Sequence, residues 1–247
     1  MSDQTSQRGA RGRPENLLLN LACNIVLPGL ILSRLSADDR LGPLAALLLG
    51  ISFPLGYGLY DLVARRKWNF FSIVGLFSVG LTGSFALMKL DGFWFAVKEA
   101  SIPALFGVAV LATVGADKPL ARELILNASV IDLPRLEAGL DARGTRRQFD
   151  RLLRISTWWM SAGFALSAVL NFVLARVVLK SPGGTAEFTA ELGRMTWLSW
   201  PVIALPSMVL TMLILWRLLA GVQELTGLEL DDLLHVHQGG SADPTDP

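Results

Sequence analysis

The hydrophobic and polar positions of this chain alternate in long blocks, because apolar runs are separated by short polar segments. A helix needs about 20 mainly apolar residues to cross a bilayer, so each long run predicts one transmembrane helix. The sequence therefore predicts an all-α protein, a polytopic transmembrane helix bundle of six spans. The predicted spans are Leu17–Leu35, Pro43–Val63, Phe70–Leu90, Phe93–Gly115, Leu153–Val178 and Trp197–Leu219.

The segments around these spans complete the predicted organisation. Residues 1–14 are polar and predict a disordered cytoplasmic tail, with no small-residue cleavage site of a signal peptide behind it. Residues 15–115 hold transmembrane helices one to four, and residues 153–220 hold helices five and six. Between these blocks, residues 116–152 predict a basic cytoplasmic loop with short helices. Residues 221–247 predict a cytoplasmic C-terminal helix and a disordered tail.

Basic residues orient the predicted bundle, because cytoplasmic loops of membrane proteins are enriched in Lys and Arg. With the N-terminus inside, fifteen Lys and Arg residues fall on the cytoplasmic side and six on the other side. All seven tryptophans lie near predicted span ends, as expected for aromatic belts at the two interfaces. Both termini are therefore predicted to be cytoplasmic.

Composition supports a membrane protein and excludes several other classes. The chain is 52% hydrophobic and only 17% charged, whereas soluble domains average about 25% charged residues. A net charge of +1 gives no basic footprint for nucleic acid. The single cysteine, Cys23, excludes an internal disulfide, and the two histidines lie near the C-terminal end. We therefore expect no metal site and no cofactor.

The basic loop contains two helix-compatible stretches, and the second carries several arginines. Its apolar residues do not form one clean stripe: Leu136, Leu140, Phe149, Leu152 and Leu153. A helix lying on the anionic inner leaflet is one interpretation of this stretch. Ordinary positive-inside bias is the other, and both remain open at this stage.

Polar and small residues form stripes inside several spans, at the four-residue spacing that lines one helix face. In the first span Asn20 and Asn24 share a face, and in the third Gly80 and Ser84 form a pair of small residues. A structural interpretation assigns such stripes to helix–helix contacts. The functional interpretation is a polar path through the bundle, as in a transporter or channel.

Lys98 and Glu99 are ionisable residues near the outer end of the fourth predicted span. In a structural interpretation, Lys98 extends its aliphatic stem to the headgroups, and Glu99 is favoured by the helix N-terminus. In a functional interpretation, both belong to a site for a solute, an ion or a lipid, since charges inside a membrane are rare. Neighbouring helical residues point about 100° apart, so we expect them to be poor partners for each other.

A candidate intramembrane polar site follows from these side chains. Its members are the ionisable and amide residues of four spans: Lys98, Glu99, Asn20, Asn24, Asp61 and Asn171. Convergence on one cavity that water can reach would favour transport, whereas scattered contacts would favour a scaffold. The sequence contains no catalytic motif of a hydrolase, a P-loop or a zinc protease, so we predict no catalytic residues and no enzyme.

Three stretches of the chain form a pattern that occurs elsewhere: WNFFSIVGLFSVGLTGSFAL with a short charged turn, then ADKPLARELI, and then RRQFDRLLRISTWWMSAGFALSAVLNFVLA. In this order they resemble the intracellular septation protein A family of bacterial inner-membrane proteins. The matching positions are Gly80, Lys98, Pro103, Lys118, Pro119, Leu120, Trp158 and Asn171. The family tends to carry an acidic residue before its first proline, where this chain has Asn24, so the chain resembles a divergent relative.

The resemblance implies a multi-pass protein of the bacterial inner membrane that supports envelope or septation processes through protein partners. It implies no enzymatic reaction. We therefore expect the lipid bilayer as its environment and other membrane or envelope proteins as partners, with a homo-oligomer as a further alternative. A small transporter or channel that uses the candidate polar site is the competing hypothesis.

Overall fold

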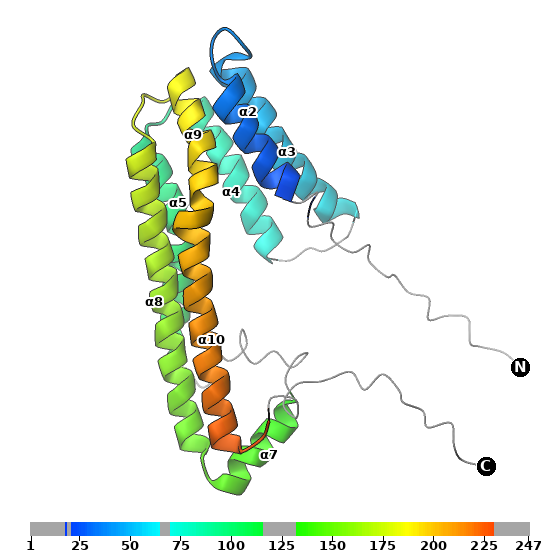
Figure 1. Ribbon diagram of the computed structural model, residues 1–247, viewed down its shortest axis with the longest axis vertical. Coiled ribbons are helices and arrows are strands. Elements are labelled where there is room, and N and C mark those ends of the chain that lie inside the picture. The colour runs from blue at the N-terminus through cyan, green and yellow to red at the C-terminus, as the bar shows by residue number, and fades with distance from the viewer. Residues whose placement is uncertain (1–17, 19–20, 65–69, 116–131, 230–247) are drawn as a thin grey trace, which may run out of the picture. The chain divides into compact units, whose positions relative to one another are not determined.

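A computed structural model describes residues 18, 21–64, 70–115 and 132–229, and within these ranges every regular element is a helix (Figure 1). The elements in chain order are η1 (Ala22–Val26), α2 (Leu27–Leu35), α3 (Gly42–Ala64), α4 (Phe70–Leu87), α5 (Gly92–Ala112), α7 (Leu133–Arg143), α8 (Arg146–Val178), α9 (Ala186–Ser199), η2 (Trp200–Ala204) and α10 (Leu205–Thr226). The prediction of an all-α protein is confirmed.

Four helical segments in the described ranges are long and apolar enough to cross a membrane: Gly42–Tyr60, Gly92–Ala112, Arg146–Val178 and Ala186–Thr226. Two shorter apolar segments, Ala22–Leu35 and Phe77–Leu87, lie where the first and third spans are predicted. A helical membrane protein is therefore supported, while the number of six spans stays a prediction.

The last two long helices extend well beyond the predicted spans. Helix α8 begins at Arg146 rather than Leu153, and its 33 residues measure about 50 Å. The helix from Ala186 to Thr226 has 41 residues and measures about 62 Å. Both lengths exceed the roughly 30 Å of a hydrocarbon core. Hydropathy marks where a helix is apolar, whereas capping groups such as the Thr185 hydroxyl decide where it begins.

Two π-helical turns, η1 and η2, interrupt the apolar helices, and each ends just before a proline. Pro28 lies two residues after η1, and Pro206 lies two residues after η2. A proline in a helix removes one backbone donor, and its ring clashes with the carbonyl four residues earlier. A wider turn relieves this clash, and the Leu27 amide accordingly donates to the Ala22 carbonyl, five residues back.

The chain divides into two compact units, and the first contains residues 1–99 and 171–202. Its helices α2 and α9 are antiparallel. They pack closely because glycines lie where the two helices touch. A Cβ on Gly29 would lie 2.8 Å from Trp197 Nε1, and one on Gly193 would lie 2.7 Å from the Ser33 amide. The buried ring of Phe95 packs edge-on against Phe85 and Phe188, at centroid distances of 5.8 and 5.3 Å.

Two loops of the same unit pack directly against each other. Gly183, between α8 and α9, lies against the backbone oxygens of Lys89 and Leu90, so closely that a Cβ there would overlap both. The Glu191 carboxylate holds the second loop, since it accepts hydrogen bonds from the Ser181 amide and hydroxyl at 3.1 and 2.8 Å. The Gly183 contact joins the α4–α5 turn to the α8–α9 loop, and Glu191 of α9 fixes that loop.

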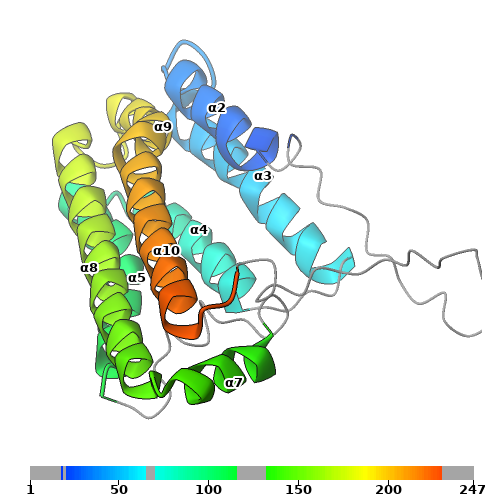
Figure 2. The same ribbon diagram turned by 60° about the horizontal axis from the view of Figure 1, so that its bottom comes forward.

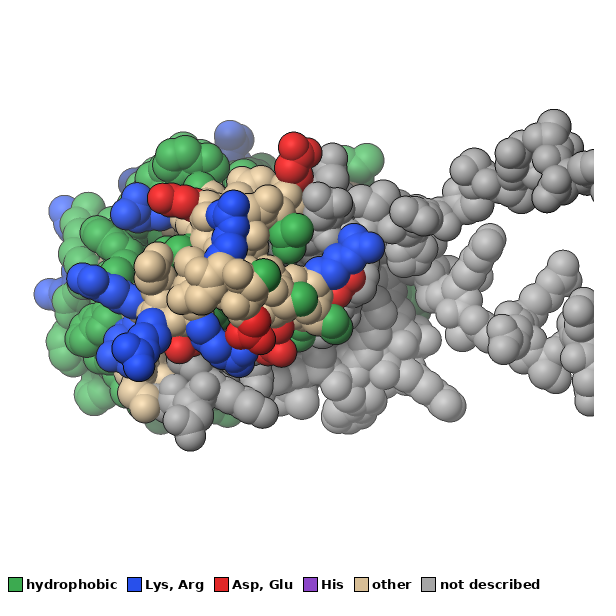
Figure 3. Space-filling model, turned by 90° about the horizontal axis from the view of Figure 1, so that it is seen from below, with side chains coloured by type: hydrophobic (Ala, Val, Ile, Leu, Met, Phe, Trp, Pro, Cys, Tyr) green, Lys and Arg blue, Asp and Glu red, His purple; other side chains and the backbone are tan. Residues whose placement is uncertain are grey.

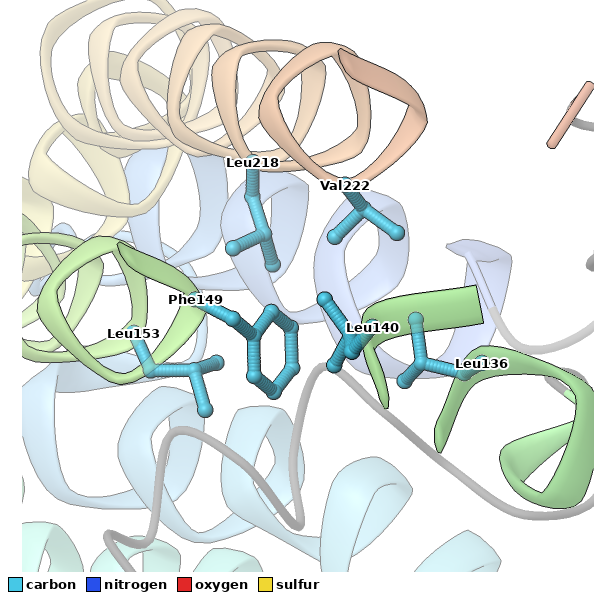
Figure 4. Close-up of a cluster of buried hydrophobic side chains, with 6 residues drawn as sticks. All are labelled: Leu136, Leu140, Phe149, Leu153, Leu218 and Val222. Carbon is cyan, nitrogen blue, oxygen red and sulfur yellow. The ribbon is translucent and has the colours of Figure 1, made fainter. Parts of the chain in front are cut away.

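The second unit contains residues 100–170 and 203–247, and helix α7 crosses the adjacent ends of α8 and α10 in it (Figures 1 and 2). A buried apolar cluster joins these three helices (Figure 4), and its members are Leu136, Leu140, Phe149, Leu153, Leu218 and Val222. Leu218 and Val222 belong to α10, and the other four side chains lie on α7 and α8, on either side of a break at Gly144. This break explains why the sequence shows no single apolar stripe.

Polar contacts fasten the same break to the end of α10. Gly144 adopts a left-handed conformation with φ of 65°, which ends α7 and turns the chain into α8. The Thr145 hydroxyl donates to the Leu225 carbonyl at 2.9 Å, and the Arg143 guanidinium donates to the Glu224 carbonyl at 3.1 Å. The last carbonyls of a helix lack partners within the helix, so both contacts stabilise its C-terminus.

Leu140→Ala is expected to loosen α7 from the ends of α8 and α10. Leu140 is 1% exposed, and truncation of a buried leucine to alanine costs about 2–5 kcal/mol. Hydrogen exchange in nanodiscs should then show faster exchange over α7 than in the wild type. Asp141→Ala is the matched control, because Asp141 is exposed and its ion pair with Arg146 lies at the protein surface, where such pairs contribute little stability. Equal exchange rates in both variants would contradict a packed α7.

Candidate functional site

The most unusual polar group in the described helices is the Lys98 side chain of α5. It lies in the first unit and is only 4% exposed. Its ammonium group donates to the Thr82 hydroxyl of α4 and lies 2.7 Å from Glu99 Oε1. We call Lys98, Glu99 and Thr82 the charged triad.

One expectation about this lysine is wrong. The Lys98 side chain is buried and directed at α4, which gives no support to the interpretation in which its stem extends to the headgroups. Lys98 and Glu99 are also direct partners, although successive helical residues diverge at their Cβ atoms. The four-carbon lysine stem spans this divergence, and a buried ammonium strongly favours a carboxylate partner over none.

Local sequence explains how α4 and α5 come close enough for this contact. Residues of the α4–α5 hairpin oppose each other when they lie equally far from Leu90, as the ring pair Phe85–Phe95 does. Thr82 and Lys98 satisfy the same rule. The short turn therefore sets the register that aligns the hydroxyl with the ammonium group.

The triad forms a directed chain of hydrogen bonds. The Thr82 hydroxyl donates to the Ser78 carbonyl of its own helix at 3.0 Å, which leaves its oxygen free to accept from Lys98. The opposite end of the chain, Glu99, is 25% exposed at its side chain. The arrangement can hold a fixed ion pair between helices. It also gives a charged group one route to the surface, through the Glu99 carboxylate.

Of the predicted polar site, the structure brings Lys98 and Glu99 together. Asn24 lies in η1 and Asn171 in α8, each half-buried and each engaged in an interaction. Asn20 lies outside the described residues, and so does the side chain of Asp61. Convergence of all six residues on one cavity therefore stays a prediction. Thr82, a polar residue of the third predicted span that the candidate polar site did not include, is the residue that the structure adds.

The family-like positions lie in different surroundings. Gly80 faces open space, since a Cβ there would meet nothing within 4 Å, and Ser84 donates to the Gly80 carbonyl within α4. The predicted helix contact of this small pair is therefore absent within the described residues. Pro103 lies inside α5, and Trp158 is exposed on α8. The remaining family-like positions lie outside the described residues: Lys118, Pro119 and Leu120.

Other small and polar residues do make the expected helix contacts. Gly50 of α3 admits Leu32 of α2, because a Cβ there would lie 3.1 Å from the leucine side chain. In the second unit, the Ser161 hydroxyl of α8 donates to the Gly107 carbonyl of α5 at 2.9 Å. Phe106 and Phe164 stack beside this bond at 5.6 Å. Close approach and interhelical hydrogen bonds are the usual means of helix association in membranes.

Among the described residues, no group of three or more His, Cys, Asp or Glu side chains is arranged to hold a metal ion. Comparison of the chain with protein-family models, with curated proteins and with solved structures finds no match. Its function is therefore argued from its own geometry.

Proposed function

We propose that this chain is a non-enzymatic inner-membrane protein of the septation protein A type. In this proposal it has six spans, both termini lie in the cytoplasm, and it supports envelope or septation processes by binding other membrane proteins. The charged triad supports a binding role rather than transport, because its lysine is buried and paired within the protein. A satisfied ion pair between two helices serves assembly and leaves no open cation for a solute.

The surfaces of the helices support a role in binding. Large apolar side chains remain exposed on several of them, for example Phe77, Leu105 and Trp216, each at least 67% exposed. Lipid covers such side chains in a membrane, and a partner helix replaces lipid where its shape fits. Polar contacts with a partner would come from the helix ends, since α7 and the start of α8 present a basic, mostly exposed surface.

The proposed topology gives a direct expectation for chemical labelling. Cys23→Ser removes the only native cysteine, and single cysteines then replace Lys180 or Asp141, both exposed. A maleimide that cannot cross membranes should label position 180 in cells whose outer membrane alone is opened. Position 141 should react only after the inner membrane is also permeabilised. Labelling of position 141 before that step would contradict a cytoplasmic α7.

Partner binding is tested by crosslinking in living bacteria, followed by quantitative mass spectrometry of the purified protein. Envelope or division proteins should be enriched over an unrelated six-span protein expressed at the same level. A variant with Arg143, Arg147, Arg151 and Arg154 changed to Gln should lose those partners that bind the basic end. Failure to enrich any envelope protein in repeated experiments would contradict the proposal.

A transporter or channel is the second candidate, and the exposed edge of Glu99 favours it. Ionisable residues inside membrane spans often mark ion or proton pathways. Purified protein in liposomes should then carry a solute or proton flux that Lys98→Ala and Glu99→Gln reduce at least tenfold. A flux that both variants leave unchanged would exclude the charged triad as its site.

A further inference from the structure

An apolar groove runs between α8 and α10 in the second unit. The two helices are antiparallel there, because a Cβ on Gly221 would meet the Leu152 side chain and one on Gly163 would meet Leu210. The groove is lined at helical spacing on both sides, by Leu152, Ile155, Ser156 and Trp159 of α8 and by Leu210, Leu213, Ile214 and Arg217 of α10. Each set covers two turns, or about 10 Å of helix.

The groove can hold a hydrocarbon chain. Its cavity volume is about 210 Å³, and an apolar cavity of about 150 Å³ is large enough for benzene. Seven of its eight lining residues are neither acidic nor basic. Ile155, Trp159 and Leu213 are 41–55% exposed, so the walls are open to the surrounding lipid.

The groove lies at the boundary between charged and apolar helix surface. Helix α8 carries Arg147, Arg151 and Arg154, and residues 155–175 that follow contain no charged residue. Helix α10 is uncharged over residues 205–216 and then presents Arg217. Trp159 lies beside this boundary, where tryptophan is enriched in membrane proteins. On both helices, charged residues therefore give way to apolar ones at one level, as the headgroup of a phospholipid gives way to its acyl chains.

Among the described residues, Arg154 and Arg217 at this boundary have no acidic partner. Nearer α7, Arg146 lies 3.9 Å from Glu137 and 3.5 Å from Asp141. In the part of the chain that the structure describes, no carboxylate lies within ion-pair distance of Arg154 or Arg217. Figure 3 views this end of the unit and shows basic side chains beside exposed apolar ones. The groove thus joins an apolar floor to an uncompensated positive charge.

We propose that the groove binds one anionic phospholipid, with an acyl chain between α8 and α10 and the phosphate at Arg217. A guanidinium pairs with phosphate through two parallel hydrogen bonds, and Arg217 is the groove's only charged lining residue. The inference depends on the proposed topology only for which leaflet supplies the lipid, because binding itself requires no particular orientation.

Native mass spectrometry of the full chain in detergent tests this site with added phosphatidylglycerol and phosphatidylcholine. We expect tighter binding of phosphatidylglycerol, an approximately tenfold loss of its affinity in Arg217→Gln, and retention in Arg217→Lys. Arg147→Gln is the matched control, since Arg147 is exposed on the same end of α8 outside the groove, and it should lower affinity less than twofold. Leu213→Trp should fill the groove and weaken binding of both lipids, and its elution profile checks folding.

Three results would overturn the proposal. Equal affinity for the two lipids would show that the groove does not select for the anionic headgroup. Equal losses in Arg217→Gln and Arg147→Gln would show that the attraction is diffuse. A dimer that Leu213→Trp abolishes, with phosphatidylglycerol affinity unchanged, would assign the groove to a second copy of the chain. None of these results bears on envelope partners or solute flux, so the proposed function is tested separately.

Discussion

Gly183→Ala is expected to destabilise the protein by about 3 kcal/mol, at the upper end of the usual cost of overpacking. The added Cβ would overlap the backbone oxygens of Lys89 and Leu90. Backbone atoms of a tight turn cannot move aside as the end of a flexible side chain can. The α8–α9 loop must therefore lift away from the α4–α5 turn, and the contacts between the two loops are lost. Thermal unfolding in detergent, followed by tryptophan fluorescence, should show a midpoint several degrees lower.

Gly56→Ala is the control for this substitution. Gly56 lies inside α3, and a Cβ there would meet nothing within 4 Å. Alanine is favoured over glycine in a helix by up to about 1 kcal/mol, so the midpoint should stay unchanged or rise. If Gly183→Ala behaved like Gly56→Ala, the close approach of the two loops would be refuted.

Lys98→Met is expected to cost about 3 kcal/mol, because removing one member of a buried ion pair leaves the other charge without compensation. Methionine retains most of the volume and the flexible stem, so the loss reflects the charge rather than a cavity. The Thr82 hydroxyl loses its donor at the same time. Unfolding by urea or heat in nanodiscs, compared with the wild type, measures this difference.

The double variant Lys98→Met with Glu99→Gln separates pairing from solvation. If the two residues stabilise each other, the double variant should be more stable than Lys98→Met alone, since no unpaired charge remains. Arg176→Met is the control, because Arg176 is an exposed cation of α8 whose guanidinium lies over the Phe93 ring, 5.9 Å from its centroid. Additive effects of the two single substitutions would contradict a coupled pair and would favour two independent roles.

The sequence predicts the parts of the candidate site that depend on neighbouring residues, and it does not predict contacts between residues far apart in the chain. Lys98 and Glu99 stand out because charged residues are rare in an apolar run. Their partnership and the burial of Lys98 could not be predicted, because both depend on where α4 lies. Thr82 looks like an ordinary polar residue of an apolar helix. Only the hairpin register, which places positions equally far from Leu90 opposite each other, identifies it as the lysine's partner.

The groove of the second unit illustrates the same limit in another way. Its eight lining residues follow helical spacing on each helix, yet nothing in either stretch indicates that the two faces meet. The apolar cluster beneath α7 is similar, since its leucines belong to helices separated by the break at Gly144. Such sites are assembled from distant segments, and sequence periodicity reports one helix at a time.

The sequence by itself determined the helical class, the positions of the apolar helices and their alternation with charged ends. These properties follow from local rules, because every backbone polar group in a membrane must be satisfied within its own helix and apolar length must match the bilayer. Tertiary structure alone decided the pairing of Lys98 with Glu99 and Thr82 and, among the described residues, the lack of helix contact at Gly80. The physical reason is that burial and close approach depend on neighbours brought together by the fold.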